Sequence, residues 1–161
     1  LTYYEQGITP LELREPMGLW VYGCDRCQNI CPRNAAWLAK ELPINQKTAA
    51  MVEDFKLNSL LHMDVQYFNS RIWPHMFYTS EKDLWRWKMN VARAMGNTLD
   101  DQFVPELAKA FQENEDERVL GMIAWALGRI GGPQAQKTLS VGLSKSGGLV
   151  KQEILAALEK C

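Results

Sequence analysis

The chain of 161 residues carries 18 basic and 19 acidic residues, which gives a formal net charge of -1. This near-neutral balance argues against a strongly basic nucleic-acid surface, although it is compatible with a local basic patch. Apolar residues make up 47% and charged residues 23% of the sequence, as is ordinary for a chain that buries a core. The sequence contains neither a bilayer-spanning apolar stretch nor a secretory leader pattern, so we expect no membrane partner.

The first 34 residues are rich in glycine and proline, which predicts loops interrupted by short helical turns. The stretch TPLELREPMG predicts one such turn. In this prediction Thr9 is the N-cap, Pro10 takes the first helical position and Glu12 completes a capping box. Pro16 is expected to end the turn early.

Helical spacing of apolar residues begins further along the chain. NAAWLAKEL (34–42) predicts a helix capped by Asn34 and closed by Pro43. A looser helical pattern covers 50–80. Ser80, followed by acidic residues, is expected to begin another helix.

The last half of the chain repeats itself. NVARAMGN (90–97) is similar to IAWALGRIGG (123–132) and to ILAALEK (154–160). A period near 30 residues built from helix pairs is typical of an α-solenoid. The small residues recur because they let successive helices approach closely. The matched pairs, 32 positions apart, are Val91 and Ile123, Ala94 and Ala126, Met95 and Leu127, Gly96 and Gly128, Leu107 and Leu139, and Phe111 and Leu143.

These patterns predict an all-α fold, an α-solenoid of HEAT-like helix pairs preceded by an irregular cysteine-containing segment. Three domains are expected. They are the cysteine-containing segment 1–42, a helical connector 43–83 and the HEAT-like repeats 84–161.

Cys24, Cys27 and Cys31 follow the spacing C-x2-C-x3-C-P, with Pro32 directly after the third cysteine. This spacing is typical of bacterial ferredoxin runs that bind iron–sulfur clusters. Four-thiolate zinc is an alternative, although a second C-x2-C pair is missing. Covalent haem is disfavoured because Gln28, rather than histidine, follows Cys27. Merely structural buried cysteines are a further alternative. The clustered spacing does not resemble a secreted disulfide framework, so we expect a reducing cytoplasm.

A [4Fe-4S] cluster needs four thiolates, and in two-cluster ferredoxin runs the last cysteine before proline serves the other cluster. Cys24 and Cys27 are therefore expected to bind one cluster and Cys31 its neighbour. Cys161 lies far beyond the motif and is expected to be a free thiol. We expect the missing ligands to lie upstream of Leu1, in a longer parent protein.

Two stretches resemble a known family, the epoxyqueuosine reductases. LTYYEQG, followed by GCDRCQNICPRN (23–34), is similar to the second half of that family's double-cluster region. KMNVARAMGN (88–97) is similar to the family's entry into its C-terminal HEAT-like repeats. The resemblance covers nearly the whole chain. Its cysteine motif is specific and its repeats are less so.

The resemblance implies a cobalamin-dependent oxidoreductase with two [4Fe-4S] clusters that reduces epoxyqueuosine to queuosine in tRNA. It implies that Cys24 and Cys27 complete one cluster and that Cys31 is the fourth ligand of the other. The cobalamin domain would lie outside this sequence, so the chain alone is expected to be inactive. An electron donor protein and tRNA are the implied partners. Before the repeats the family tends to be rich in Arg and Lys, whereas IWPHMFYTSEKDLWRWKMN is aromatic. A related protein with another electron acceptor is therefore an alternative.

The alternative function is a non-enzymatic HEAT-like protein-binding module with a zinc-loaded or vestigial cysteine turn.

Other side chains have simpler interpretations. The aromatic residues before the repeats fit a core that joins the cysteine segment to the solenoid, or else a surface that stacks on bases. The two histidines are expected to be packed or surface residues. The aromatic residues are Trp73, Phe77, Tyr78, Trp85 and Trp87, and the histidines are His62 and His75. A further hypothesis is a basic edge formed by Arg86, Lys88, Arg93 and Arg129.

Overall fold

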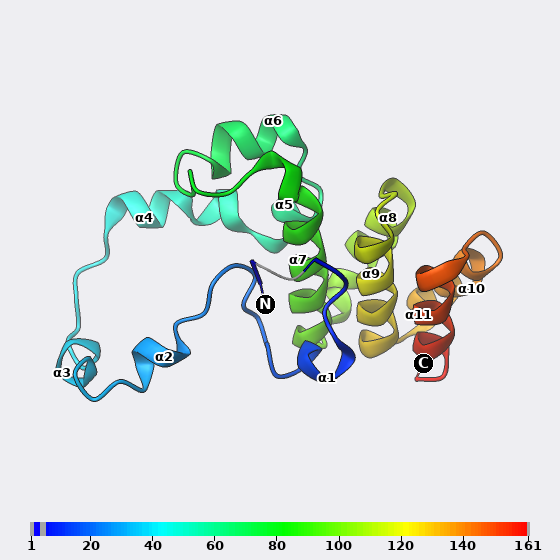
Figure 1. Cartoon of the computed structure of the whole chain (residues 1–161), viewed down its shortest axis with the longest axis horizontal. Coiled ribbons are helices and arrows are strands. Elements are labelled where there is room, and N and C mark those ends of the chain that lie inside the picture. Colours follow the sequence, from blue (N-terminus) through cyan, green and yellow to red (C-terminus); the bar gives the residue numbers. More distant parts are fainter. Residues whose placement is uncertain (1, 4–5, 161) are drawn as a thin grey trace.

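The computed structural model describes residues 2–3 and 6–160, and the regular elements in this part of the chain are all helical (Figure 1). None of these helices is long and apolar enough to cross a membrane. The elements before the repeats are α1 (Leu11–Arg14), α2 (Arg26–Asn29), α3 (Ala35–Leu38), α4 (Gln46–Met51), a 3-10 turn (Val52–Phe55), α5 (Leu57–Leu61), α6 (Val65–Tyr67), a π-helical turn (Phe68–Ile72) and a 3-10 turn (Glu81–Asp83). The repeat helices are α7 (Leu84–Thr98), α8 (Val104–Glu113, after a 3-10 turn Asp101–Phe103), α9 (Glu117–Ile130), α10 (Pro133–Leu143) and α11 (Gly148–Leu158).

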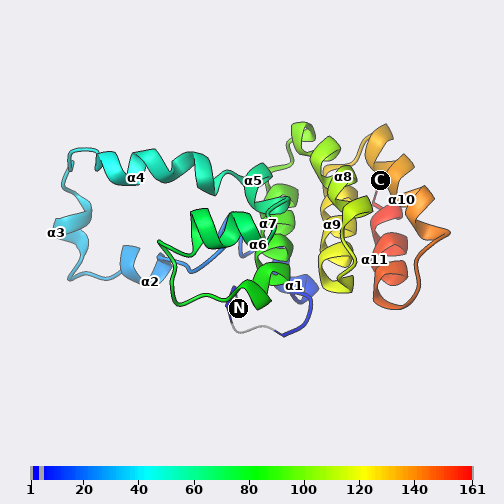
Figure 2. The same cartoon turned by 90° about the horizontal axis from the view of Figure 1, so that it is seen from above.

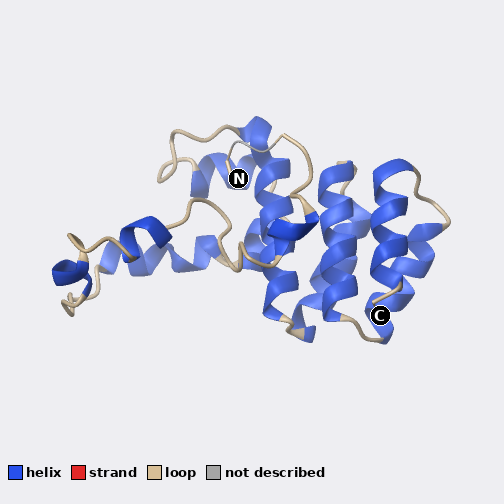
Figure 3. Ribbon diagram, turned by 60° about the horizontal axis from the view of Figure 1, so that its bottom comes forward, coloured by secondary structure: helices blue, strands red, loops and turns tan. Residues whose placement is uncertain are grey.

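The long helices form a solenoid of helix pairs. Helix α7 packs against α9 and α9 against α11, while α8 packs against α10 in a second row (Figure 3). Helix α11 stands where a third pair begins, as the internal repeat predicts. The prediction of an all-α solenoid is therefore confirmed. Ser80 also begins its turn as expected, because its side chain accepts a hydrogen bond from the Lys82 amide.

Glycine sets the distance between the first helices of successive repeats. A Cβ added at Gly96 would lie 2.9 Å from the Cα of Ala126. A Cβ added at Gly128 would lie 2.5 Å from the Cβ and 2.7 Å from the Cα of Ala157. Real side chains do not approach this closely, so each glycine allows its helix to touch the backbone of the next. This contact explains why glycine recurs 32 residues apart.

Replacing Gly128 by alanine is expected to lower the free energy of unfolding by about 1–2 kcal/mol. Overpacking a core costs about 1–3 kcal/mol, and the higher helix propensity of alanine, about 1 kcal/mol, offsets only part of it. The obstructing atoms belong to the Cα, Cβ and carbonyl of Ala157, which cannot rotate away. Urea unfolding followed by circular dichroism measures the effect.

Gly121→Ala, on the same helix α9, is the matched control. Its added Cβ would meet side-chain atoms rather than backbone, namely Ile8 Cδ1 at 2.9 Å, Glu153 Cγ at 3.3 Å and Leu149 Cγ at 3.8 Å. We therefore expect this variant to lose less stability than Gly128→Ala. Equal stability of the Gly128→Ala variant and the wild type would contradict the close packing of α9 on α11.

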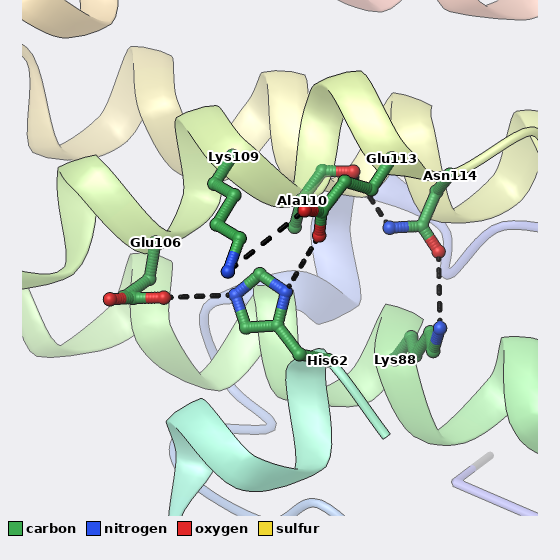
Figure 4. Close-up of polar contacts among 7 residues, drawn as sticks. All are labelled: His62, Lys88, Glu106, Lys109, Ala110, Glu113 and Asn114. Carbon is green, nitrogen blue, oxygen red and sulfur yellow. Dashed lines mark hydrogen bonds and ion pairs between the residues drawn. The ribbon is translucent and has the colours of Figure 1, made fainter. Parts of the chain in front are cut away.

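The core of the solenoid continues into the segment that precedes it. Leu61, Phe68 and Ile72 are fully buried together with residues of the repeat helices, and α5 packs against α7. At the end of α5, both ring nitrogens of His62 contact α8 carboxylates, Nε2 that of Glu106 at 2.9 Å and Nδ1 that of Glu113 at 3.1 Å (Figure 4). His62 is thus a packing residue that joins α5 to the solenoid, as expected.

Residues 6–22, which we call the strap, run across the row of first helices. Arg14 donates to both carboxylate oxygens of Glu153 on α11, each at 2.7 Å. Nη1 of Arg118, on α9, donates to the carbonyl oxygen of Gln6 at 3.1 Å. The strap therefore contacts helices that lie more than a hundred residues away in sequence.

Two predicted helix boundaries are wrong. The first turn begins at Leu11 with Pro10 at the cap position, so Thr9 is not its N-cap. The carbonyl oxygen of Thr9 instead accepts a hydrogen bond from the buried Arg14. The helix expected over 34–42 is reduced to α3, which has four residues. So short a helix depends on tertiary packing for its stability, and α3 buries none of its residues.

Residues 23–52 form an arm that extends away from the solenoid (Figures 1 and 2). None of its residues is buried, and only three are partly buried, the others being exposed. Several large apolar side chains point into solvent, with exposed fractions from 57% to 83%. They are Ile30, Trp37, Leu42, Ile44 and Val52.

Candidate metal centre

The motif residues occupy the root of the arm, in a segment that we call the cysteine loop (23–34). Gly23 has a φ of 75°, which favours glycine and turns the chain into the loop. Helix α2 forms one turn. The side-chain nitrogen of Asn34 then donates to the carbonyl and side-chain oxygens of Gln28 at 3.0 and 2.9 Å. The amide of Asn34 also donates to the carbonyl of Cys31 at 2.9 Å, so local hydrogen bonds shape the loop.

The three loop cysteines are free thiols. Cys24 and Cys27 are exposed and Cys31 is partly exposed. Over residues 2–3 and 6–160, no group of three or more His, Cys, Asp or Glu side chains is arranged to hold a metal ion. Cys161 lies outside the described residues. Accessible sulfur donors without a complete ligand set fit clusters whose remaining ligands come from other residues.

A cavity of about 220 Å³ adjoins the first cysteine. Its wall is largely apolar and comes from both the strap and the cysteine loop. The lining residues are Thr2, Pro16, Met17, Trp20, Cys24 and Arg26. The strap therefore forms part of the surroundings of the Cys24 thiol.

Helix α7 holds the strap and Thr2 through three polar side chains on one face, which we call the α7 polar row (Asn90, Arg93 and Asn97). Arg93 donates from Nη1 to the Gly18 carbonyl at 2.9 Å and from Nη2 to the Trp20 carbonyl. The neighbouring amides bind carbonyls too. Asn90 donates to that of Thr2 at 3.0 Å, and Asn97 to those of Arg14 and Gly18 at 2.7 and 2.9 Å.

Arg93 is fully buried, and burial lowers the pKa of its guanidinium to about 10. It therefore keeps its charge at neutral pH. The predicted basic edge is wrong because Arg93 is fully buried and Arg86 is only 4% exposed. Nη1 of Arg129 contacts the carboxylate of Glu15 at 2.6 Å. These arginines bind segments of the chain rather than present charge to solvent.

An aromatic cluster seals the junction between the strap and α7. The ring of Tyr22 stacks on that of Trp87 with centroids 4.7 Å apart, and Tyr3 meets Tyr22 edge-on at 5.6 Å. Burial raises the pKa of Tyr22 well above its ordinary value, so its hydroxyl stays neutral. Trp87 thus belongs to the core that joins the cysteine segment to the solenoid, whereas Phe77 is 71% exposed.

Asn90 and Asn97 are functional candidates that sequence reasoning missed. The available signal is a set of polar residues spaced three and four apart in NVARAMGN, on a helix otherwise rich in small apolar residues. Such spacing places them on one face. Their partners are backbone carbonyls more than 70 positions away, which no local pattern reveals.

Comparisons with known proteins agree with this architecture. The family model for HEAT repeats matches residues 80–159. An uncharacterized protein in the gldA 3' region of Geobacillus stearothermophilus is 31% identical, over 96% of this chain and 70% of its own length. Epoxyqueuosine reductase of Bacillus subtilis is 28% identical, over 87% of this chain and 36% of its own.

Solved structures give the same relationship. The epoxyqueuosine reductase of Bacillus subtilis matches with 28% identity and a TM-score of 0.74, over 97% of this chain and 41% of that one. An epoxyqueuosine reductase with a tRNA-Tyr epoxyqueuosine-modified stem loop matches with 26% identity and a TM-score of 0.75, over the same shares.

The fold and the loop define a HEAT-repeat protein with a cysteine-bearing arm. The chain belongs to an epoxyqueuosine reductase-like family. It spans 36% of the Bacillus subtilis enzyme's sequence and 41% of the solved chains.

Proposed function

We propose that this chain is the cluster-ligand and repeat portion of an epoxyqueuosine reductase-like oxidoreductase. The observation that carries the proposal is C-x2-C-x3-C-P, with free, accessible thiols, on a loop attached to HEAT repeats. The division into 1–42, 43–83 and 84–161 follows from this proposal, because each part then has a separate task. The first holds ligands, the second connects, and the third forms a recognition surface.

In this proposal Cys24 and Cys27 bind one [4Fe-4S] cluster and Cys31 binds the other. When bound, the clusters supply one-electron transfer. The residues of this chain hold and orient them. Asn34 fixes the end of the loop through its bonds to Gln28, and the strap supports the beginning. The remaining thiolates and the cobalamin-binding domain belong to residues outside this sequence, so the chain by itself should not catalyse a reaction.

The proposed substrate is epoxyqueuosine in tRNA, reduced with electrons from a donor protein in the cytoplasm. A related epoxyqueuosine reductase was solved with a modified tRNA stem loop, which supports this substrate class. Phosphate contacts make nucleic-acid affinity fall steeply with salt. A stem-loop binding assay over a salt series therefore tests the RNA role, and binding that is absent or insensitive to salt would contradict it.

The decisive experiment measures iron and acid-labile sulfide per chain after anaerobic reconstitution. It compares this chain with a version extended upstream of Leu1. We expect only the extended version to take up about eight iron atoms, the content of two [4Fe-4S] clusters.

Two other results of this experiment would contradict the iron–sulfur proposal. Stoichiometric zinc without iron in the extended version would favour the non-enzymatic HEAT-like binding module with a structural zinc turn. Absence of any metal would leave the repeats as the functional part.

A further inference from the structure

The α7 polar row is unusual because its central residue is a fully buried cation whose partners, among residues 2–3 and 6–160, are carbonyl oxygens. Arg93 donates to the carbonyls of Gly18 and Trp20, and in the described part of the chain its guanidinium contacts no carboxylate. Burying an unpaired charge is costly unless hydrogen bonds compensate for it. A methionine of similar size would fill the same space without this cost. Packing alone therefore does not explain a guanidinium here.

The same junction concentrates buried polar atoms without a hydrogen-bond partner. Among the described residues, all but one of these side-chain atoms belong to α7 or to Tyr22, which packs on it. They are Tyr22 Oη, Trp87 Nε1, Asn90 Oδ1, Arg93 Nε and Asn97 Oδ1, and the exception is Arg129 Nε. Buried polar groups are normally hydrogen-bonded, and each exception calls for an explanation such as a water molecule, a bound ion or a redox role. The junction therefore has hydrogen-bonding capacity beyond the contacts that hold the strap.

The place of the Gly18 and Trp20 carbonyls in the chain, just before the cysteine loop, suggests what the α7 polar row does. Trp20 is four residues before Cys24, and both line the 220 Å³ cavity. Each intervening residue spans at most about 3.6 Å, so fixing the Trp20 carbonyl restricts where the Cys24 sulfur can lie. Tyr22, between them, is held by its stack on Trp87. The repeats therefore fix the chain on the N-terminal side of the cysteine loop.

We propose that the α7 polar row, with Arg93 at its centre, is a positioning device that sets the place of Cys24 for cluster binding and supplies a buried positive charge near that cluster. This proposal rests on the proposed function for the cluster itself. A thiolate-bound [4Fe-4S] cluster gains negative charge when reduced, and nearby charge shifts its potential. A fixed cation therefore favours the reduced form. The first repeat helix then serves the redox centre as well as the solenoid.

The first test uses this chain without metal, so that it does not depend on cluster chemistry. Arg93→Met removes the donors to Gly18 and Trp20, and we expect amide hydrogen exchange at residues 18–24 to become about tenfold faster. The matched control is Arg118→Met, which removes a guanidinium that also donates to a strap carbonyl, that of Gln6. It should leave residues 18–24 unchanged. Unchanged exchange in the Arg93→Met variant would overturn the positioning role, whether or not iron is ever found.

The second test uses the upstream-extended protein. We expect Arg93→Met to lose the Cys24–Cys27 cluster, so that iron falls from about eight to about four atoms per chain, or else to keep it with a lower reduction potential. Full iron content with an unchanged potential would overturn the proposal. Absence of iron from the wild type would instead contradict the proposed function.

Arg93→Lys guards against simple misfolding of the methionine variant. Lysine keeps the charge, but its single ammonium cannot match the planar guanidinium that spans two carbonyls. We expect faster exchange at 18–24 and partial loss of iron, with the potential of the remaining cluster close to that of the wild type. Wild-type exchange and iron content in the lysine variant would count against positioning, even if the methionine variant does not fold.

Discussion

Serine in place of Cys27 is expected to remove about half of the iron from the upstream-extended protein, leaving roughly four atoms per chain, as one [4Fe-4S] cluster requires. The reason is the proposed allocation of ligands, in which Cys24 and Cys27 share a cluster and Cys31 serves the other. Cys31→Ser should therefore also remove about half, and the Cys27→Ser/Cys31→Ser double variant should remove nearly all. A Cys24→Ser/Cys27→Ser double variant should lose no more than Cys27→Ser alone.

The measurement is iron and acid-labile sulfide per chain, with the spectrum of the reduced cluster as a second readout. Cys161→Ser is the matched control, since that cysteine lies far from the motif in sequence and is proposed to bind nothing. It should retain all iron. If the Cys27→Ser/Cys31→Ser double variant retained about half of the iron, as each single variant does, the three cysteines would serve a single cluster, and the allocation would then be wrong.

The repeats could be predicted because their cause is local and periodic. Gly96 and Gly128 mark the points where first helices touch, and the contacts to Ala126 and Ala157 explain why small residues recur there. A helix that buries the same face in each repeat must repeat the same spacing. The sequence pattern and the packing therefore carry the same information.

The role of Arg93 could not be predicted because it depends on which distant segment covers α7. Arginine on a helix is usually exposed, so the sequence favours a basic edge. The strap covers this face instead, and its carbonyls, rather than side chains, receive the guanidinium. Every residue has a backbone carbonyl, so the sequence does not show which carbonyls will bind a distant side chain. A row of polar residues on one helix face shows only that something polar is bound there.

In the arm, the sequence pattern predicts more regular structure than the chain forms. The apolar spacing in 34–42 is genuinely helical, yet only Ala35–Leu38 forms a helix. Periodicity predicts a helix on the condition that the apolar face is buried, and here Trp37 is 68% exposed. Without that burial a short helix gains too little to offset its conformational entropy. The prediction was wrong because its condition is not met in this chain.

Replacing Arg14 by alanine is expected to lower the free energy of unfolding by about 3–5 kcal/mol, the usual cost of breaking a buried ion pair from one side. The side chain of Arg14 is 3% exposed and that of Glu153 is 15% exposed, and the two are joined by two hydrogen bonds of 2.7 Å. The variant leaves the Glu153 carboxylate without its partner. It also frees the Thr9 carbonyl. Urea unfolding at neutral pH measures the loss.

The contributions of charge and of packing at the Arg14–Glu153 pair can be separated, because an apolar pair of similar volume keeps the packing and removes the charges. Arg14→Met/Glu153→Leu removes both charges and fills a similar volume, so we expect it to recover most of the stability that Arg14→Ala loses. The exposed pair of Lys56 and Glu53, 57% and 74% exposed, is the control, and Lys56→Ala should cost no more than about 1 kcal/mol. If the double variant were as unstable as Arg14→Ala, the loss would come from the bond to Thr9. The strap would then be held on the solenoid by its backbone rather than by the ion pair.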